Sequence, residues 1–129
     1  MKLSVKLFLE DQGRYVLGPG RMRLLHSVET LGSLHKAAQE LGMSYRWAWG
    51  RLNDMEKFLG IRLLAHAPGS GGKAKTLTGE ARDLLAWYDS VEKDMAEVLD
   101  KAVDRLPAFT RMSAFDPEAG NTVPKRPEK

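Results

Sequence analysis

The sequence predicts a mainly α-helical domain with a small amount of β structure, and three observations lead to this fold class. Apolar residues recur every three or four positions through three segments between residues 19 and 59, which is the spacing of amphipathic helices. Short stretches on either side of these segments have the alternation and turn residues of β-hairpins. A heptad pattern then runs from residue 77 to residue 102 and predicts one long helix.

The composition is that of a globular protein. The chain has 129 residues, of which 43% are hydrophobic and 29% charged, enough for one domain with a core. No apolar run approaches the roughly 20 residues that span a bilayer, and the N-terminus does not read as a signal peptide. The absence of cysteine excludes disulfides and thiolate metal sites. We therefore expect a cytoplasmic protein without membrane contact.

Charge divides the chain into a basic and an acidic part. Residues 1–75 hold 12 Lys or Arg against 6 Asp or Glu, whereas residues 76–106 hold 4 against 8. This division indicates that the first part meets a polyanion and the second part does not.

The N-terminus predicts a β-hairpin. Apolar and polar residues alternate over residues 3–9 ("LSVKLFL"), which predicts a strand with one buried face and with Lys2 and Lys6 on the solvent side. "EDQGR" has the residues of a turn, and "YVLG" follows as the returning strand.

Three helices follow in close succession. The first begins at Pro19, which suits a first helical turn, and ends at Gly32. Ser33 is the expected N-cap of a second, short helix that Gly42 ends, and Ser44 caps a third helix that runs to about residue 59. Two helices joined by a tight glycine turn, the second longer and richer in arginine and aromatic residues, are typical of a helix-turn-helix.

The third helix has distinct faces when its residues are placed 100° apart. Its core stripe is Ala48, Leu52, Met55 and Leu59, extended by Phe58. Arg46, Gly50, Asn53 and Lys57 fall opposite, Tyr45 and Trp49 on one flank, and Trp47 and Arg51 on the other. The outer face suits a DNA major groove, although a solvated face remains the alternative. Trp49 is expected to be partly structural and Trp47 more exposed.

A second hairpin and the long helix complete the domain. "IRLLA" and "KAKTL" predict two strands around a glycine-rich loop, which is a wing when it directly follows a recognition helix. Thr78 caps the long helix, which extends to about residue 103, roughly 39 Å at 1.5 Å per residue. One small domain does not cover such a helix, so a second copy is expected to pair with it through the residues Leu84, Tyr88, Val91, Met95 and Val98.

These elements define three segments and a set of candidate DNA contacts. Residues 1–77 form a winged helix-turn-helix with an N-terminal hairpin, residues 78–104 a dimerisation helix, and residues 105–129 a mobile tail. The recognition helix spans residues 44–59 and the wing residues 66–76. The candidate contacts are Ser44, Tyr45, Arg46, Trp47, Trp49, Gly50, Arg51 and Asn53 on the recognition helix, Arg21, Arg23 and Lys36 on the preceding helices, and Ser70, Gly71, Gly72, Lys73 and Lys75 in the wing.

Nothing in the sequence indicates catalysis, a cofactor or a metal. The three histidines fall on separate elements without ligand spacing, and no nucleophile is paired with a base. The glycine-rich loop lacks the spacing of a nucleotide-binding loop. We therefore expect no enzyme, no cofactor and no metal site.

"GSLHKAAQELGMSYRWAWGRLNDMEKFLGIRLLAHAPGSGGKAKTLT" resembles the winged helix-turn-helix of LysR-type regulators, and more closely the N-terminal domain of ModE-like regulators. The resemblance covers residues 3–104. It implies a dimeric DNA-binding module whose long helix pairs two copies. Gly79 stands earlier than the family's glycine after the Leu-Thr pair. ModE-like proteins continue into oxyanion-binding domains, whereas about 25 residues follow the long helix here, so no molybdate site is expected in this chain.

The function predicted from the sequence is a homodimeric, sequence-specific regulator that binds double-stranded DNA. The alternative is a winged-helix module that dimerises and binds proteins without reading DNA.

Overall fold

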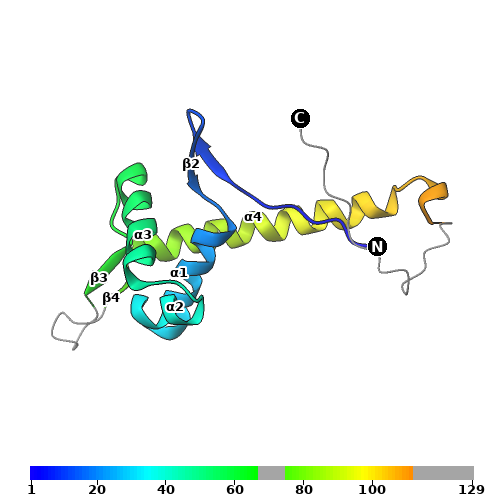
Figure 1. Cartoon of the computed structure of the whole chain (residues 1–129). Coiled ribbons are helices and arrows are strands. Elements are labelled where there is room, and N and C mark those ends of the chain that lie inside the picture. Colours follow the sequence, from blue (N-terminus) through cyan, green and yellow to red (C-terminus); the bar gives the residue numbers. More distant parts are fainter. Residues whose placement is uncertain (67–74, 112–129) are drawn as a thin grey trace.

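A computed structural model describes residues 1–66 and 75–111 as a helical domain with two small sheets and one projecting helix (Figure 1). The elements, in chain order, are β1 (Leu9–Asp11), β2 (Arg14–Leu17), α1 (Pro19–Leu31), α2 (Leu34–Glu40), α3 (Tyr45–Leu59), β3 (Leu64–His66), β4 (Lys75–Leu77), α4 (Gly79–Asp104) and a 3-10 turn at Ala108–Arg111. The predicted fold class, mainly α with a small β component, is confirmed.

The N-terminal hairpin is present but shorter than the sequence predicted. β1 and β2 are antiparallel, and Asp11 pairs with Arg14 across a two-residue turn. Both turn residues, Gln12 and Gly13, have positive φ values of 50° and 78°, which is the backbone of a tight hairpin turn. The strand predicted over residues 3–9 is wrong, because regular pairing begins only at Leu9.

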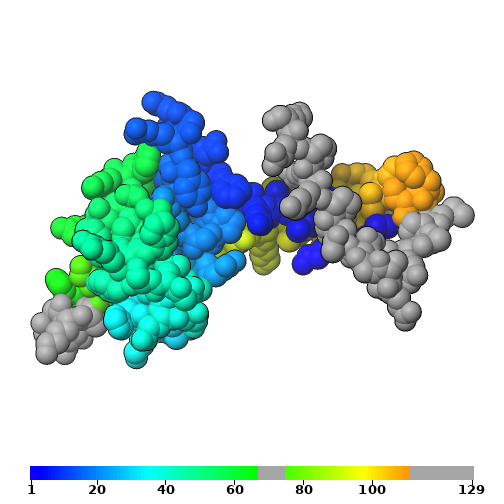
Figure 2. Space-filling view, in the orientation of Figure 1, coloured from blue at the N-terminus to red at the C-terminus, as the bar shows by residue number. Residues whose placement is uncertain are grey.

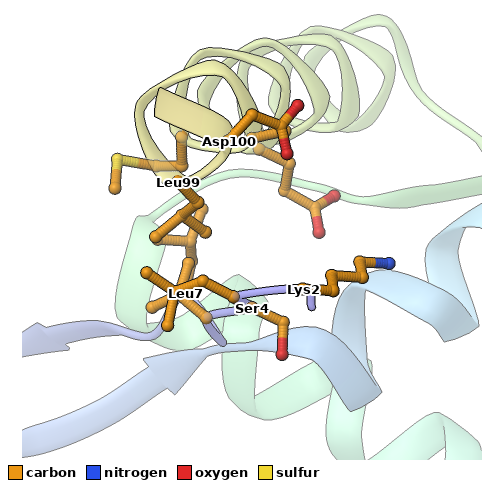
Figure 3. Close-up of a pocket in the computed structure, with 10 residues that line it drawn as sticks. Lys2, Ser4, Leu7, Leu99 and Asp100 are labelled. Atoms are coloured by element: carbon orange, nitrogen blue, oxygen red, sulfur yellow. The ribbon is translucent and has the colours of Figure 1, made fainter. Parts of the chain in front are cut away.

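Residues 1–8 instead form an extended arm that leaves the hairpin and runs along α4 (Figure 1). The hydroxyl of Tyr88 on α4 donates a hydrogen bond of 2.8 Å to the carbonyl oxygen of Leu7. Farther out, arm and helix line a hollow of about 260 Å³, in which Leu7 and Leu99 come from opposite walls (Figure 3). The alternation in the sequence therefore corresponds to an extended chain beside a helix, in which Leu7 is half-buried and Leu3 and Val5 are 48% and 50% exposed.

The predicted helix caps are confirmed. Ser33, Ser44 and Thr78 each accept a hydrogen bond of 3.1 Å from the backbone N–H three residues ahead. These bonds satisfy amide groups that the first turn of a helix leaves unpaired. At Gly42, a φ of 69° turns the chain sharply from α2 into α3, a backbone conformation that favours glycine.

The core lies where α1, α2, α3 and the start of α4 meet. Helix α1 packs against α2, α3, α4 and β4, and α2 packs against α3. The predicted inner faces of these helices are largely confirmed, whereas Phe58, expected in the core, is exposed. The buried core residues are Val16, Leu17, Met22, Leu24, Leu25, Val28, Leu34, Ala37, Ala38, Ala48, Leu52, Met55, Leu63, Leu64, Leu77, Ala81, Leu85 and Tyr88.

Buried and polar contacts join α4 to the body of the domain. Thr78 Oγ1 donates to the carbonyl oxygen of Arg62 at 2.6 Å, so that the start of α4 is tied to the chain entering β3. An exposed ion pair, Arg82–Glu29 at 3.1 Å, and an exposed hydrogen bond between His26 Nε2 and Asp89 Oδ1 at 2.9 Å bridge α4 and α1. Exposed pairs of this kind contribute little stability. Burial of Ala81 and Leu85 therefore does most to anchor the helix.

Beyond this anchor, α4 projects from the body of the domain that the structure describes, and the arm lies beside it (Figure 1). Residues 67–74 of the predicted wing and residues 112–129 of the predicted tail lie outside the described residues. Within the described ranges, no helix has both the length and the hydrophobicity needed to cross a membrane.

We predict that Tyr88→Phe loosens the arm. The lost hydrogen bond lowers the free energy of unfolding at pH 7 by about 0.5–1.5 kcal/mol, measured by urea denaturation. Burial raises the pKa of the Tyr88 hydroxyl, with a smaller contribution from the charge of Glu92. The unfolded chain therefore releases this proton first as the pH rises. The wild type loses stability above pH ~10, near the ordinary tyrosine value, and the variant loses less over that range.

The control is Tyr45→Phe, at a tyrosine that is 40% exposed. This variant should change neither the free energy of unfolding at pH 7 nor the loss of stability at high pH. If Tyr88→Phe unfolds at the same urea concentration as the wild type at pH 7, the arm is not held as described.

Candidate nucleic-acid interface

The rotation of α3 about its axis is fixed by its buried stripe. Ala48, Leu52 and Met55 are each at most 1% exposed and pack in the core, which leaves one orientation in which they are all covered. Ser44 fixes the first turn by accepting from the N–H of Trp47. The opposite face of the helix is therefore presented outward.

That outer face carries the residues predicted for it. Arg46 and Lys57 are exposed, and Gly50 and Asn53 are half-buried. A Cβ added at Gly50 would meet no atom of the described chain within 4 Å. No internal packing requires glycine at this position, although glycine lowers helix propensity. The helix backbone can therefore be approached closely at the centre of this face.

Trp47 and Arg51 lie together on the flank of α3 that faces the N-terminal hairpin. The Arg51 guanidinium carbon lies 4.3 Å from the centre of the Trp47 ring, and its Nη2 is 3.4 Å from an Asp54 oxygen. Its Nε is buried and has no hydrogen-bond partner in the described part of the chain. Arg51 is thus held flat against an aromatic ring that is 56% exposed.

Tyr45 and Trp49 lie on the other flank. The Tyr45 ring is 5.8 Å from the ring of His35 on α2, so it leans against the neighbouring helix. Trp49 was expected to be partly structural and is 42% exposed, less than Trp47. The predicted order of exposure of the two tryptophans is therefore found in the structure.

The basic residues predicted on the earlier helices differ in how firmly they are held. Arg21, in the first turn of α1, donates from Nη1 to the carbonyl oxygen of Val16 at 2.7 Å and stacks on Tyr15 at 4.6 Å. Arg23 and Lys36 are exposed. Arg21 therefore braces the hairpin against α1, a role that the sequence did not reveal.

The base of the predicted wing is anchored to α3. A carboxylate oxygen of Glu56 accepts from the N–H of Leu63 at 2.8 Å, just before β3. β3 pairs antiparallel with β4, and Lys75 opposes His66. The other predicted wing contacts, Ser70, Gly71, Gly72 and Lys73, lie outside the described residues.

Sequence reasoning missed a group of residues between the hairpin and α3. The guanidinium of Arg14 lies 5.9 Å from the centre of the Phe58 ring, which is exposed although a core position was expected. Phe58 lies at the edge of the apolar stripe, so its helical position alone could not settle its burial. The signal available in the sequence was the concentration of Arg and aromatic residues in both segments.

Among the residues that the structure describes, no three His, Asp or Glu side chains gather as a metal site would require. The arrangement instead combines exposed cations, exposed aromatic rings and an open helix face. These groups can bind phosphates and base edges.

This region of the chain is similar to a known protein family and to solved structures. Residues 19–82 match the family described as bacterial regulatory helix-turn-helix protein, lysR family. Among solved structures, the domain is similar to the BenM DNA-binding domain in complex with benA site 1 DNA (TM-score 0.51, 19% identity, 69% of this chain and 96% of that one). It is also similar to full-length BenM (TM-score 0.52, 19% identity, 69% and 28%). At this identity the likeness shows the fold alone, a winged helix-turn-helix.

Relatives at higher identity extend the match. The chain is 31% identical over 107 residues to the DNA-binding transcriptional dual regulator ModE of Escherichia coli K12, covering 82% of this chain and 39% of that protein. It is 32% identical over 96 residues to the molybdenum-pterin-binding protein MopB of Rhodobacter capsulatus, covering 71% and 36%. The chain therefore spans less than half the length of these relatives. These names and the family description are those of regulators and a binding protein, and none of them is the name of an enzyme.

Proposed function

Residues 19–82 are a helix-turn-helix domain of the bacterial regulatory lysR family, and from this premise we propose that the chain is a homodimeric, sequence-specific DNA-binding regulator of the cytoplasm. The observation that carries the proposal is the outer face of α3. It joins an exposed arginine, an open glycine position and an amide side chain on one rigid helix. ModE, to which the chain is similar, is described as a DNA-binding transcriptional regulator.

On this proposal α3 enters the major groove, which is about 12 Å wide and admits one helix. Arg46 pairs with a guanine edge or a neighbouring phosphate, and Asn53 is placed for an adenine edge. The open position at Gly50 lets the helix backbone sit close to the bases. Arg23, Lys36 and Lys75 contact phosphates at the edges of the site.

The proposed dimer uses one side of α4, on which Leu84 also packs against the core and Met95 also lines the hollow beside the arm. Leu84, Val91 and Met95 are half-buried and Val98 is 52% exposed, all on one side of the helix. Tyr88, predicted among them, is 3% exposed and belongs to the core. Its neighbour Trp87 is 47% exposed and falls on the free side, so we assign the apolar stripe of the dimer to Leu84, Trp87, Val91, Met95 and Val98.

The experiment that tests this function selects bound sequences from a random DNA pool with the wild-type chain, and then measures Arg46→Ala on the selected site and on random DNA. Arg46→Ala should cost about 1–3 kcal/mol on the selected site and much less on random DNA, because a base contact carries sequence information and a phosphate contact does not. No enrichment from the pool would favour the protein-binding alternative.

Gly50→Leu tests whether the backbone of α3 must lie close to the DNA bases at this position. Because the position is open and leucine is the better helix former, this variant should melt at the same temperature or slightly higher, yet bind the selected site poorly. Normal binding by Gly50→Leu, with equal losses on both DNAs for Arg46→Ala, would mean that this face does not read bases.

A charge in the α4 stripe should break the dimer. Val98→Glu places like charges against each other in paired helices, while its exposure in the single chain spares the fold. Sedimentation at micromolar concentration should find a wild-type dimer and a folded monomeric variant. Ala86→Glu adds the same charge at an exposed position outside the stripe and should remain dimeric. A monomeric wild type, or a dimeric Val98→Glu, would contradict the assignment.

A further inference from the structure

Helix α3 lies between two β-hairpins, one fixed to each flank. On one side, Glu56 holds the chain entering β3 through the N–H of Leu63 at 2.8 Å. On the other side, Arg14 at the end of the β1–β2 turn lies over the Phe58 ring at 5.9 Å. At 100° per residue, positions 56 and 58 fall on opposite flanks with Lys57 between them on the outer face. Both hairpins therefore border the face that carries Arg46 and Gly50.

The β1–β2 hairpin is held firmly at its root. Val16 and Leu17 of β2 are buried in the core, and the Arg21 guanidinium bonds to the Val16 carbonyl while stacking on Tyr15. Close packing continues at Gly18, where an added Cβ would come within 2.6 Å of the Phe8 ring. The tip nevertheless stands out from the body beside α3 (Figure 2). It is a rigid projection, as a wing must be.

The space between this hairpin and α3 is strongly cationic. One hollow of about 320 Å³ is lined by Arg14, Arg21, Asp54, Lys57 and Phe58. A second, of about 310 Å³, shares Arg21 and adds Trp47 and Arg51 to its lining. The two linings together hold four cations and one carboxylate, Asp54, while Glu10 and Asp11 are exposed on the strand that pairs with Arg14. The guanidinium of Arg14 lies 5.9 Å from the centre of the Phe58 ring, and those of Arg21 and Arg51 lie 4.6 Å and 4.3 Å from the Tyr15 and Trp47 rings. Arg21 and Arg51 also donate to the Val16 carbonyl and to Asp54, and each guanidinium has further N–H groups that can donate to phosphate.

We propose that the β1–β2 hairpin is a second wing, whose Arg14, together with the cations of α1 and α3 that line the hollow beside it, binds the DNA phosphodiester backbone on the side of α3 opposite the β3–β4 wing. The inference rests on the proposed function, because it takes the duplex to lie on the outer face of α3. A helix in the major groove has one DNA strand on each side. The Arg14–Lys57 side then meets one strand and the β3–β4 side meets the other.

The test measures DNA affinity over a range of salt concentrations for Arg14→Ala, with Lys93→Ala, an exposed cation on α4, as the matched control. Loss of one phosphate contact should reduce the log–log salt slope by about 0.9, on specific and random DNA alike. Arg14→Lys should keep most of the slope, because the charge remains. Asp54→Asn should bind several-fold more tightly than the wild type, because a carboxylate that lines the hollow beside the backbone is removed. Thermal melting accompanies each variant.

The experiment distinguishes three outcomes. In the first outcome, the wild type binds DNA, and folded Arg14→Ala has the same salt slope of DNA affinity as Lys93→Ala. This result overturns the second wing and leaves the proposed function standing. If the wild type binds no DNA at low salt, the proposed function fails, and the second wing fails with it. The second wing is supported if the salt slope of DNA affinity falls in Arg14→Ala and is retained in Arg14→Lys.

Discussion

The burial of one stripe on α3 is the constraint on which the rest of the structure depends. Ala48, Leu52 and Met55 have almost no exposed surface, and rotation of the helix would bring them into water. Small side chains at Ala37 and Ala38 let α2 lie close beneath it. With the inner face fixed in this way, everything that α3 presents outward follows from helical geometry.

The flanks of α3 connect this fixed helix to the rest of the molecule. Glu56 links it to the start of β3, and Phe58 and Arg51 meet the side of the N-terminal hairpin. Thr78 then joins the end of β4 to α4, so that the long helix leaves the domain in a defined direction. In a dimer paired through α4, the spacing between two copies of α3 would therefore be set by rigid connections.

Local features were predictable from the sequence, and contacts between distant segments were not. The cap at Ser44 depends on residues one turn apart, which a sequence displays directly. The alternation in residues 3–8 predicts an extended chain, yet it does not say that this chain lies beside α4. Tyr88 and Trp87 are adjacent and both suit an apolar stripe; which one is buried depends on how α4 rotates against α1. Likewise, the contact of the exposed Phe58 ring with Arg14 depends on where the hairpin lies relative to α3, which the sequence does not display.

The central claim is that DNA covers the outer face of α3, and the absence of cysteine allows a direct measurement of it. A single cysteine introduced by Asn53→Cys reports on that face, and one introduced by Ala86→Cys reports on an exposed position of α4. The rate of thiol alkylation is measured for each variant with and without the selected DNA. The account predicts that DNA slows the reaction strongly for Asn53→Cys and leaves Ala86→Cys unchanged. Equal rates for Asn53→Cys in the presence and absence of bound DNA would contradict it.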